Sequence, residues 1–202
     1  MNKINYQRET DRIVARLEAE GRRERLLLHV CCAPCASYVL EYLTQHFDVT
    51  VFFSNPNIAD PVEYQKRLDE LYRFCAEAPF CRGVTVVPDD CPPARFFDAA
   101  AGLEDEPEGG ARCDRCFRLR LSRTADYAQA NGFPLFATTL TVSPHKDPVL
   151  INGIGADEAA RCGVGYLPSD FKKRGGYQRS IVLSREHGLY RQDFCGCPFS
   201  QR

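Results

Sequence analysis

Short apolar runs alternate along this chain with stretches of helical periodicity, and this alternation constrains the fold more than any other feature. The runs cover residues 26–30, 49–53, 84–87 and 135–140. Between them, apolar side chains recur at three- and four-residue intervals, as on one face of a helix. Strands that alternate with helices are typical of a parallel sheet covered by helices on both faces. We therefore predict an α/β fold.

The helical segments complete this prediction. With 202 residues, of which 44% are hydrophobic, the chain can build one compact domain over 1–202. Residues 1–24 are expected to form an N-terminal helical extension, and the proline-, glycine- and acid-rich residues 88–112 a surface loop. Helices are predicted at 6–20, around Val39–Phe47, from Asp60, at 114–130, from Ser143–Pro144 and at 175–187.

Charge and hydropathy indicate where the chain acts. Its N-terminus is polar and charged, and its longest apolar runs are too short to cross a bilayer, so we expect a cytoplasmic protein with no membrane partner. The formal net charge is −1. Because no overall positive field attracts nucleic acid, any such contact must be local.

Three loops follow predicted strands directly: Cys31–Cys35, Ser54–Asn57 and Ser143–His145. The carboxyl ends of parallel strands lie at one edge of a sheet, where such folds bind their ligands. The three loops should therefore share one rim of the molecule.

The chain has 11 cysteines. In a reducing cytosol this number indicates metal or redox chemistry rather than disulfides. Seven have the short spacings of metal ligands, as C-C-x-x-C, C-x-x-C and C-x-C: Cys31, Cys32, Cys35, Cys113, Cys116, Cys195 and Cys197. The other four are expected to be structural: Cys75, Cys81, Cys91 and Cys162.

Thiolate ligands suit either zinc or an iron–sulfur cluster. A structural zinc ion would use four of the seven cysteines and leave three unexplained. The surplus favours redox chemistry, and hence an iron–sulfur cluster with further thiols for a second iron or a redox pair.

With these residues in view, the chain resembles the QueH family, the cobalamin-independent epoxyqueuosine reductases. The resemblance runs from about Leu26 to Ser200, while residues 1–24 and 88–112 carry little of it. It rests on HVCCAPC at 29–35, NPNI at 55–58, Glu63-Tyr64, RCDRCFxxRL at 112–121, Thr124-Ala125, TTLxxSPH at 138–145, DFKK at 170–173, Gly176-Tyr177, LYRQ at 189–192 and CGCxFS at 195–200.

The resemblance implies the last step of queuosine synthesis, in which the epoxide of epoxyqueuosine at the wobble position of a tRNA is reduced to an alkene. It also implies a Rossmann-like fold, a [4Fe–4S] cluster with an adjacent iron, and an electron donor whose identity the sequence does not disclose. On this basis Cys31, Cys32, Cys113 and Cys116 are assigned to the cluster. Cys35, Cys195 and Cys197 are assigned to the second iron or a redox-active pair.

The reaction that the resemblance implies also requires a proton donor. His145, in the turn after a strand, and Asp170 are the candidates. His29, inside a buried strand, is expected instead to be a hydrogen-bonded core residue.

Two basic segments are candidates for binding the tRNA. On the helix at 114–130, Arg120 and Arg123 fall within about 40° of Cys116 at 100° per residue, and Arg115 lies close by. The second segment follows Asp170. It contributes Lys172, Lys173, Tyr177 and Arg179, a combination of cations and an aromatic ring that suits an unstacked anticodon loop.

Two other functions would use similar residues. A tRNA sulfur-transfer enzyme would need a phosphate-binding loop of the type S-G-G-x-D-S after the first strand, where this chain has C-C-A-P-C. A non-enzymatic zinc- or RNA-binding module would be colourless, whereas an iron–sulfur protein is brown.

Overall fold

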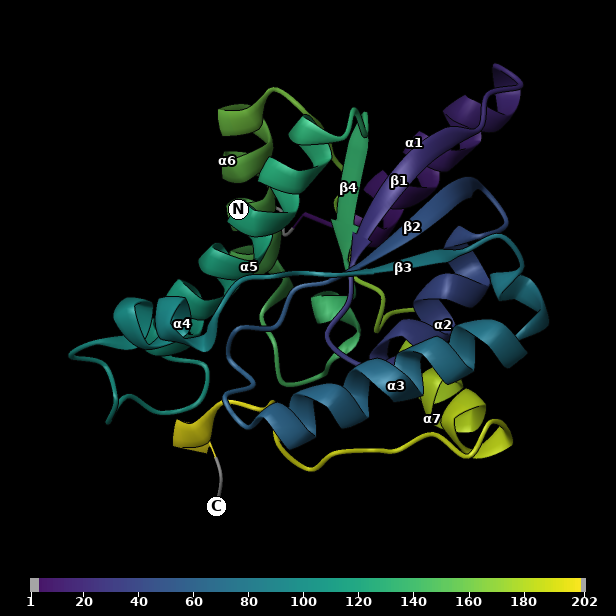
Figure 1. Ribbon diagram of the computed structural model, residues 1–202. Helices are drawn as coiled ribbons and strands as arrows, with labels where there is room; N and C mark the ends of the chain where they lie inside the picture. The colour runs from purple at the N-terminus through teal and green to yellow at the C-terminus, as the bar shows by residue number, and fades with distance from the viewer. Residues whose placement is uncertain (1–3, 201–202) are drawn as a thin grey trace.

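The computed structural model describes residues 4–200 and contains one parallel sheet flanked by helices (Figure 1). The sheet order is β3-β2-β1-β4-β5, and every neighbouring pair is parallel. This confirms the predicted α/β fold. The strands are β1 (Glu24–His29), β2 (Phe47–Phe53), β3 (Thr85–Pro88), β4 (Leu135–Thr138) and β5 (Gly165–Tyr166). The sequence did not reveal β5, because two residues are too short for a recognisable apolar run.

Seven α-helices and three short 3-10 helices are found among residues 4–200. The α-helices are α1 (Tyr6–Ala19), α2 (Ala33–Leu43), α3 (Pro61–Glu77), α4 (Pro93–Ala100), α5 (Ala111–Ala130), α6 (Pro148–Cys162) and α7 (Gly176–Glu186). The 3-10 helices are η1 (Pro79–Cys81), η2 (Thr139–Val142) and η3 (Pro198–Ser200). None of the helices in residues 4–200 has the length and apolarity needed to cross a membrane.

The central strand β1 is buried on both faces, and its side chains point alternately into two separate parts of the core. Leu26 and Leu28 point to the face covered by α1, α2 and α3, whereas Leu27 points to the face covered by α5 and α6. Burying each leucine stabilises the fold by about 1.5–3 kcal/mol. This explains why the run is continuously apolar rather than alternating.

The connection from β4 to α6 differs from the prediction. The strand ends at Thr138 and passes into η2, and α6 begins at Pro148 rather than at Ser143–Pro144. Asp147 caps α6 by accepting a hydrogen bond from Val149 N at 2.8 Å. Ser-Pro and Asp-Pro are both good helix starts, so local chemistry did not distinguish them. As a result, residues 143–146 form a turn in which Pro144 and His145 are exposed.

Residues 88–112 are not simply a surface loop, because they contain α4. Phe96 and Ala100 on this helix are buried against the C-terminal segment. Arg112 holds the following turn in place, since its Nη1 donates to three backbone carbonyls: Leu103 O at 3.2 Å, Glu104 O at 2.6 Å and Glu106 O at 2.6 Å. Helix α5 begins at Ala111, earlier than predicted, and Phe47 belongs to β2 rather than to the preceding helix.

The two ends of the described chain both pack against the domain. Helix α1 buries Val14 and Leu17 in the core, and Thr10 Oγ1 donates to Pro168 O at 2.6 Å. The C-terminal segment, in yellow, runs beneath α3 and ends beyond it, below α4 (Figure 1). It therefore crosses the rim where the carboxyl ends of the strands meet.

Candidate metal–thiolate site

A large cavity lies where the sheet order reverses. From β1 the chain turns into α2 on one face, and from β4 it leads to α6 on the opposite face. This divergence opens a crevice at the carboxyl ends of the two strands. The cavity has a volume of about 870 Å³. The expectation that the Cys31 and Ser143 loops share one rim is confirmed, because both line this cavity.

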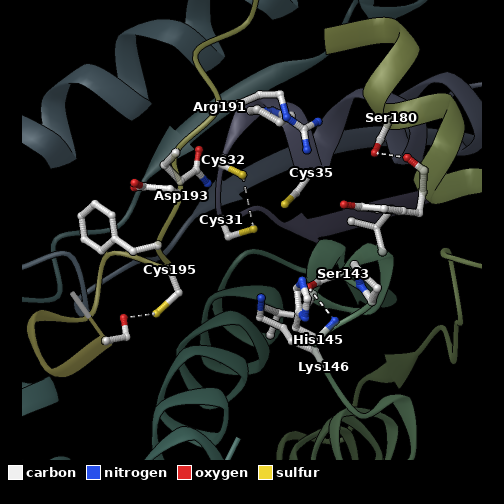
Figure 2. Close-up of a pocket in the computed structure, with 18 of the residues that line it drawn as sticks. Cys31, Cys32, Cys35, Ser143, His145, Lys146, Ser180, Arg191, Asp193 and Cys195 are labelled. Carbon is white, nitrogen blue, oxygen red and sulfur yellow. Dashed lines mark hydrogen bonds between the residues drawn. The ribbon is translucent and has the colours of Figure 1, made fainter. Parts of the chain in front are cut away.

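Three cysteines at the end of β1 point into this cavity (Figure 2). The Sγ atoms of Cys31, Cys32 and Cys35 all lie within 4.8 Å of one another. The Sγ of Cys31 is 3.8 Å from that of Cys32 and 3.6 Å from Thr139 Oγ1. The triad is therefore an all-sulfur donor set of the kind that suits zinc or iron.

The backbone explains why the loop gathers its sulfurs. Cys32 is the N-cap of α2, and Pro34 lies in the first turn of this helix. The chain therefore passes from strand to helix at Cys32, with Cys31 just before this point and Cys35 in the first helical turn. Hydrogen bonds from the Cys32 and Cys35 thiols hold the pKa of Cys31 well below its usual range despite burial. The contact with Cys31 raises the pKa of Cys32 to about 12, and the contacts with Cys31 and Cys32 raise the pKa of Cys35 well above its usual range.

The other four predicted ligands line a second, smaller cavity of about 50 Å³: Cys113, Cys116, Cys195 and Cys197. Burial raises the pKa of Cys116 to about 11, whereas the hydrogen bond from Cys197 lowers that of Cys195 to about 5. Cys195 lines both cavities. Cys31 and Cys113 pack against the same apolar cluster on α5, η2 and α6. All seven thiols therefore surround two adjoining cavities.

The assignment of Cys31, Cys32, Cys113 and Cys116 to the cluster, made on the family resemblance, stays a prediction. That assignment separated Cys35 from Cys31 and Cys32, but its sulfur lies beside theirs. The reason is the first turn of α2, which brings Cys35 back toward the end of β1.

Long-range contacts hold the C-terminal C-x-C turn against the rim. Asn57 Nδ2 and Arg67 Nη1 both donate to Cys195 O, at 3.1 and 3.3 Å. Gly196 adopts φ +95°, and a Cβ at this position would lie 2.6 Å from Ile58 Cγ1. The glycine is therefore required both by its backbone conformation and by the close approach of the chain.

Lys146 lines the same cavity as the triad and was not among the residues predicted from the sequence. His145 and Lys146 lie across the cavity from the cysteines (Figure 2), and both line the two cavities. Burial lowers the pKa of Lys146, but the nearby sulfurs of Cys31, Cys35 and Cys195 outweigh it and raise the pKa. Lys146 thus stays charged. The sequence could have indicated Lys146, because this residue follows the candidate His145 in a turn after a strand.

Asp170, the other predicted proton donor, lies outside these two cavities. It is only 4% exposed, and its carboxylate is 3.0 Å from Lys172 Nζ and 3.7 Å from Lys173 Nζ. The two lysines are thus partly neutralised by the residue that precedes them.

The predicted tRNA-binding residues fall into different environments. Arg120 is a correction, because it is 3% exposed and its guanidinium is directed into the protein rather than onto an accessible face. Arg123 pairs with Asp89 and Asp90, and Arg179 pairs with Glu41. The remaining predicted residues are accessible: Arg115 and Lys173 are exposed, Lys172 is half-buried, and Tyr177 lines the large cavity.

The four cysteines expected to be structural lie away from the two cavities, and all eleven are free. Cys81 is buried in the main core beside Cys75, and Cys162 donates to Asp126 Oδ1 at 3.3 Å. These contacts agree with a packing role.

Comparison with known proteins places this cysteine-rich rim in a family. The family model described as "Epoxyqueuosine reductase QueH" matches residues 26–202. This chain belongs to the QueH family. The match begins within β1 and includes all seven cysteines of the rim, so the resemblance noted in the sequence is confirmed.

Individual members of the QueH family align over most of their length. A protein of Streptococcus pyogenes serotype M1 is 45% identical, with 99% of this chain and 79% of the relative covered. One of Staphylococcus epidermidis is 41% identical (98% and 85%), and one of Thermotoga maritima is 37% identical (87% and 89%). All three are named epoxyqueuosine reductase QueH.

His29 in the QueH motif HVCCAPC is a hydrogen-bonded core residue, as expected. It is fully buried, with Nδ1 2.8 Å from Thr138 Oγ1 and Nε2 3.1 Å from Ser54 O. Burial, with a further effect of the Arg120 charge, lowers its pKa from 6.5 to about 3. His29 is therefore neutral at physiological pH.

We expect this histidine to make the metal-free protein less stable in mild acid. The unfolded chain binds a proton at His29 below pH 6.5, whereas the folded chain does so only near pH 3. Its contribution is fully present above pH 6.5 and is lost by up to about 1.4 kcal/mol per pH unit below it. Urea denaturation at pH 6.5, 6 and 5 measures the slope. His29→Gln should flatten it and His46→Gln should not; equal slopes in both variants would contradict the argument.

Proposed function

We propose that this chain reduces the epoxide of epoxyqueuosine, in the wobble nucleoside of a tRNA, to the alkene of queuosine. The reaction consumes two electrons and two protons and releases the epoxide oxygen as water. One observation carries the proposal: in a chain of the QueH family, seven thiols surround two adjoining cavities where the sheet order reverses. Because the substrate is a tRNA, we place the protein in the cytoplasm.

The donor set fits the proposed cofactor. All seven predicted ligands are sulfur atoms, and three of them lie within 4.8 Å of one another, as soft thiolate-bound metals require. Cys31, Cys32 and Cys35 would hold one centre and Cys113, Cys116 and Cys197 the other, with Cys195 at their junction. A [4Fe–4S] cluster with an adjacent iron would supply single electrons and a Lewis acid for the epoxide oxygen.

The side chains opposite the thiols would handle protons and charge. His145 lines both cavities and is exposed, which supports it as the proton donor better than Asp170, buried outside them. The ammonium of Lys146 lies beside the same cavities and would stabilise negative charge that develops on the epoxide oxygen. Neither role requires a group from outside the chain.

The large cavity and its rim would receive the nucleotide. Its volume of about 870 Å³ falls within the range of ordinary ligand sites. Tyr177 lines it and offers a ring for stacking an unpaired base. The tRNA backbone would contact the cations predicted to bind it: Arg115, Arg123, Lys172, Lys173 and Arg179.

Replacing both Lys172 and Lys173 with alanine is expected to weaken tRNA binding. Each lost phosphate contact should also reduce the slope of log K against log salt by about 1. Filter binding at several salt concentrations measures both effects. A matched control is the Arg12→Ala, Arg22→Ala double variant, since both arginines are exposed and Arg22 precedes β1 at the opposite edge of the sheet. Unchanged binding by the lysine variant would remove this surface from the proposal.

Anaerobic turnover tests the function directly. Purified protein, loaded with iron and sulfide, is incubated with epoxyqueuosine-containing tRNA and a chemical reductant, and the nucleosides are analysed after digestion. We expect queuosine to appear in proportion to time and a brown protein with iron and sulfide bound. A colourless protein that retains zinc and leaves the epoxide intact would favour the zinc-binding module instead.

A further inference from the structure

Arg120 is a deeply buried charge of the site. It lies on α5, one helical turn after Cys116, and is 3% exposed. Its Nη2 donates to Asn55 Oδ1 at 2.5 Å, and its Nε lies 3.2 Å from both Ser54 O and His29 Nε2. This packing fixes the guanidinium at the floor of the two cavities.

The partners of this guanidinium are the side-chain amide oxygen of Asn55, the backbone carbonyl of Ser54 and a ring nitrogen of His29. Among residues 4–200, no carboxylate forms an ion pair with Arg120. Asp89, the acid of the neighbouring loop, pairs with Arg123 instead. A buried charge without an opposite charge is strongly unfavourable, so a negative group is expected beside it.

The groups able to supply that charge are thiolates. Arg120 lines both the large cavity, with Cys31, and the small cavity, with Cys116. It therefore lies between the two thiol groups, and a metal that converts thiols to thiolates would complete its environment.

We propose that Arg120 is the buried counter-charge of the metal–thiolate centre and sets its reduction potential. The inference rests on the proposed iron–sulfur cofactor and adds a positioning residue to it. A reduced centre carries one more negative charge than an oxidised one, and a fixed cation in a poorly solvated site stabilises the reduced form more. Arg120 thus makes the centre easier to reduce.

Two substitutions cancel the positive charge of Arg120 in different ways. Arg120→Gln deletes the cation, while Asn55→Asp gives it a carboxylate partner at the position of Asn55 Oδ1 with almost no change in volume. Asn55 lines neither cavity, so Asn55→Asp leaves the metal ligands untouched. It loses the donation from Asn55 Nδ2 to Val30 O at 2.9 Å, and Asn55→Ser controls for that loss without adding charge.

The readout is the reduction potential of the iron–sulfur-loaded protein, measured by dye-mediated titration followed by electron paramagnetic resonance. In both Arg120→Gln and Asn55→Asp we expect the ratio of reduced to oxidised centre at a fixed potential to fall about tenfold, which is 59 mV for a one-electron couple. Arg120→Lys should restore most of the ratio. Arg118→Gln, a change of the same kind on the same helix at an exposed residue paired with Asp157 and Glu158, should leave it unchanged, as should Asn55→Ser.

The outcomes separate this inference from the proposed function. If the ratio of reduced to oxidised centre in Asn55→Asp stays within twofold of the wild-type value, the role of Arg120 is overturned while the cofactor remains. This test holds even where Arg120→Gln fails to fold. A wild-type chain that takes up no iron and sulfide would overturn the proposed function, and this inference with it.

Discussion

Replacing Cys35 with alanine is expected to lower the turnover of epoxyqueuosine-containing tRNA by more than about 100-fold. Loss of a group that only supports a metal ligand typically costs 10–100-fold in metal affinity or activity, and Cys35 is itself a proposed ligand. Its sulfur lies within 4.8 Å of those of Cys31 and Cys32. The iron and sulfide content should fall with the activity, whereas the circular dichroism spectrum should keep its α/β shape.

The matched control is Cys91→Ala. Cys91 is half-buried, like Cys35, but lies outside both cavities. This variant should retain its iron and its activity. That result would show that the loss of a thiol outside the two cavities impairs neither metal binding nor turnover. Full activity in Cys35→Ala would remove this residue from the mechanism and reduce the first centre to two cysteines.

Replacing Arg67 with methionine is expected to destabilise the protein by about 3–5 kcal/mol, the usual cost of leaving one partner of a buried ion pair alone. Arg67 is 2% exposed and its Nε donates to Glu63 Oε1 at 2.7 Å. Its other nitrogens donate to Cys195 O and Phe194 O. The substitution therefore strands a carboxylate and also frees the turn that carries Cys195 and Cys197.

Chemical denaturation of the metal-free protein measures the loss of stability. Iron analysis after reconstitution measures whether Cys195 and Cys197 still contribute to metal binding. The control is Arg73→Met on the same helix, where a more exposed arginine pairs with Glu70 and Glu77; such surface pairs contribute at most about 1 kcal/mol. If the two variants lost equal stability and both kept their iron, Arg67 would not be the residue that holds the C-terminal segment at the site.

The family resemblance and the fold class could be predicted because both depend on local patterns. The run at 26–30 is almost continuously apolar, as expected of a strand at the centre of a parallel sheet. Short cysteine spacings bring two sulfurs to one loop whatever the rest of the chain does. Where two local signals were equivalent, as at Ser143–Pro144 and Asp147–Pro148, the prediction chose the wrong helix start.

The tertiary structure decided which groups meet. Arg120 was predicted to face RNA from its position on the helix, yet its guanidinium donates to Asn55, 65 positions away in the chain. Arg67 reaches Cys195 across 128 positions, and Cys195 in turn joins the two thiol groups. Spacing along the chain determines only what one helix or loop presents. Which cysteines share a centre, and which arginine is its counter-charge, depends on how β1, α5 and the C-terminal segment pack together.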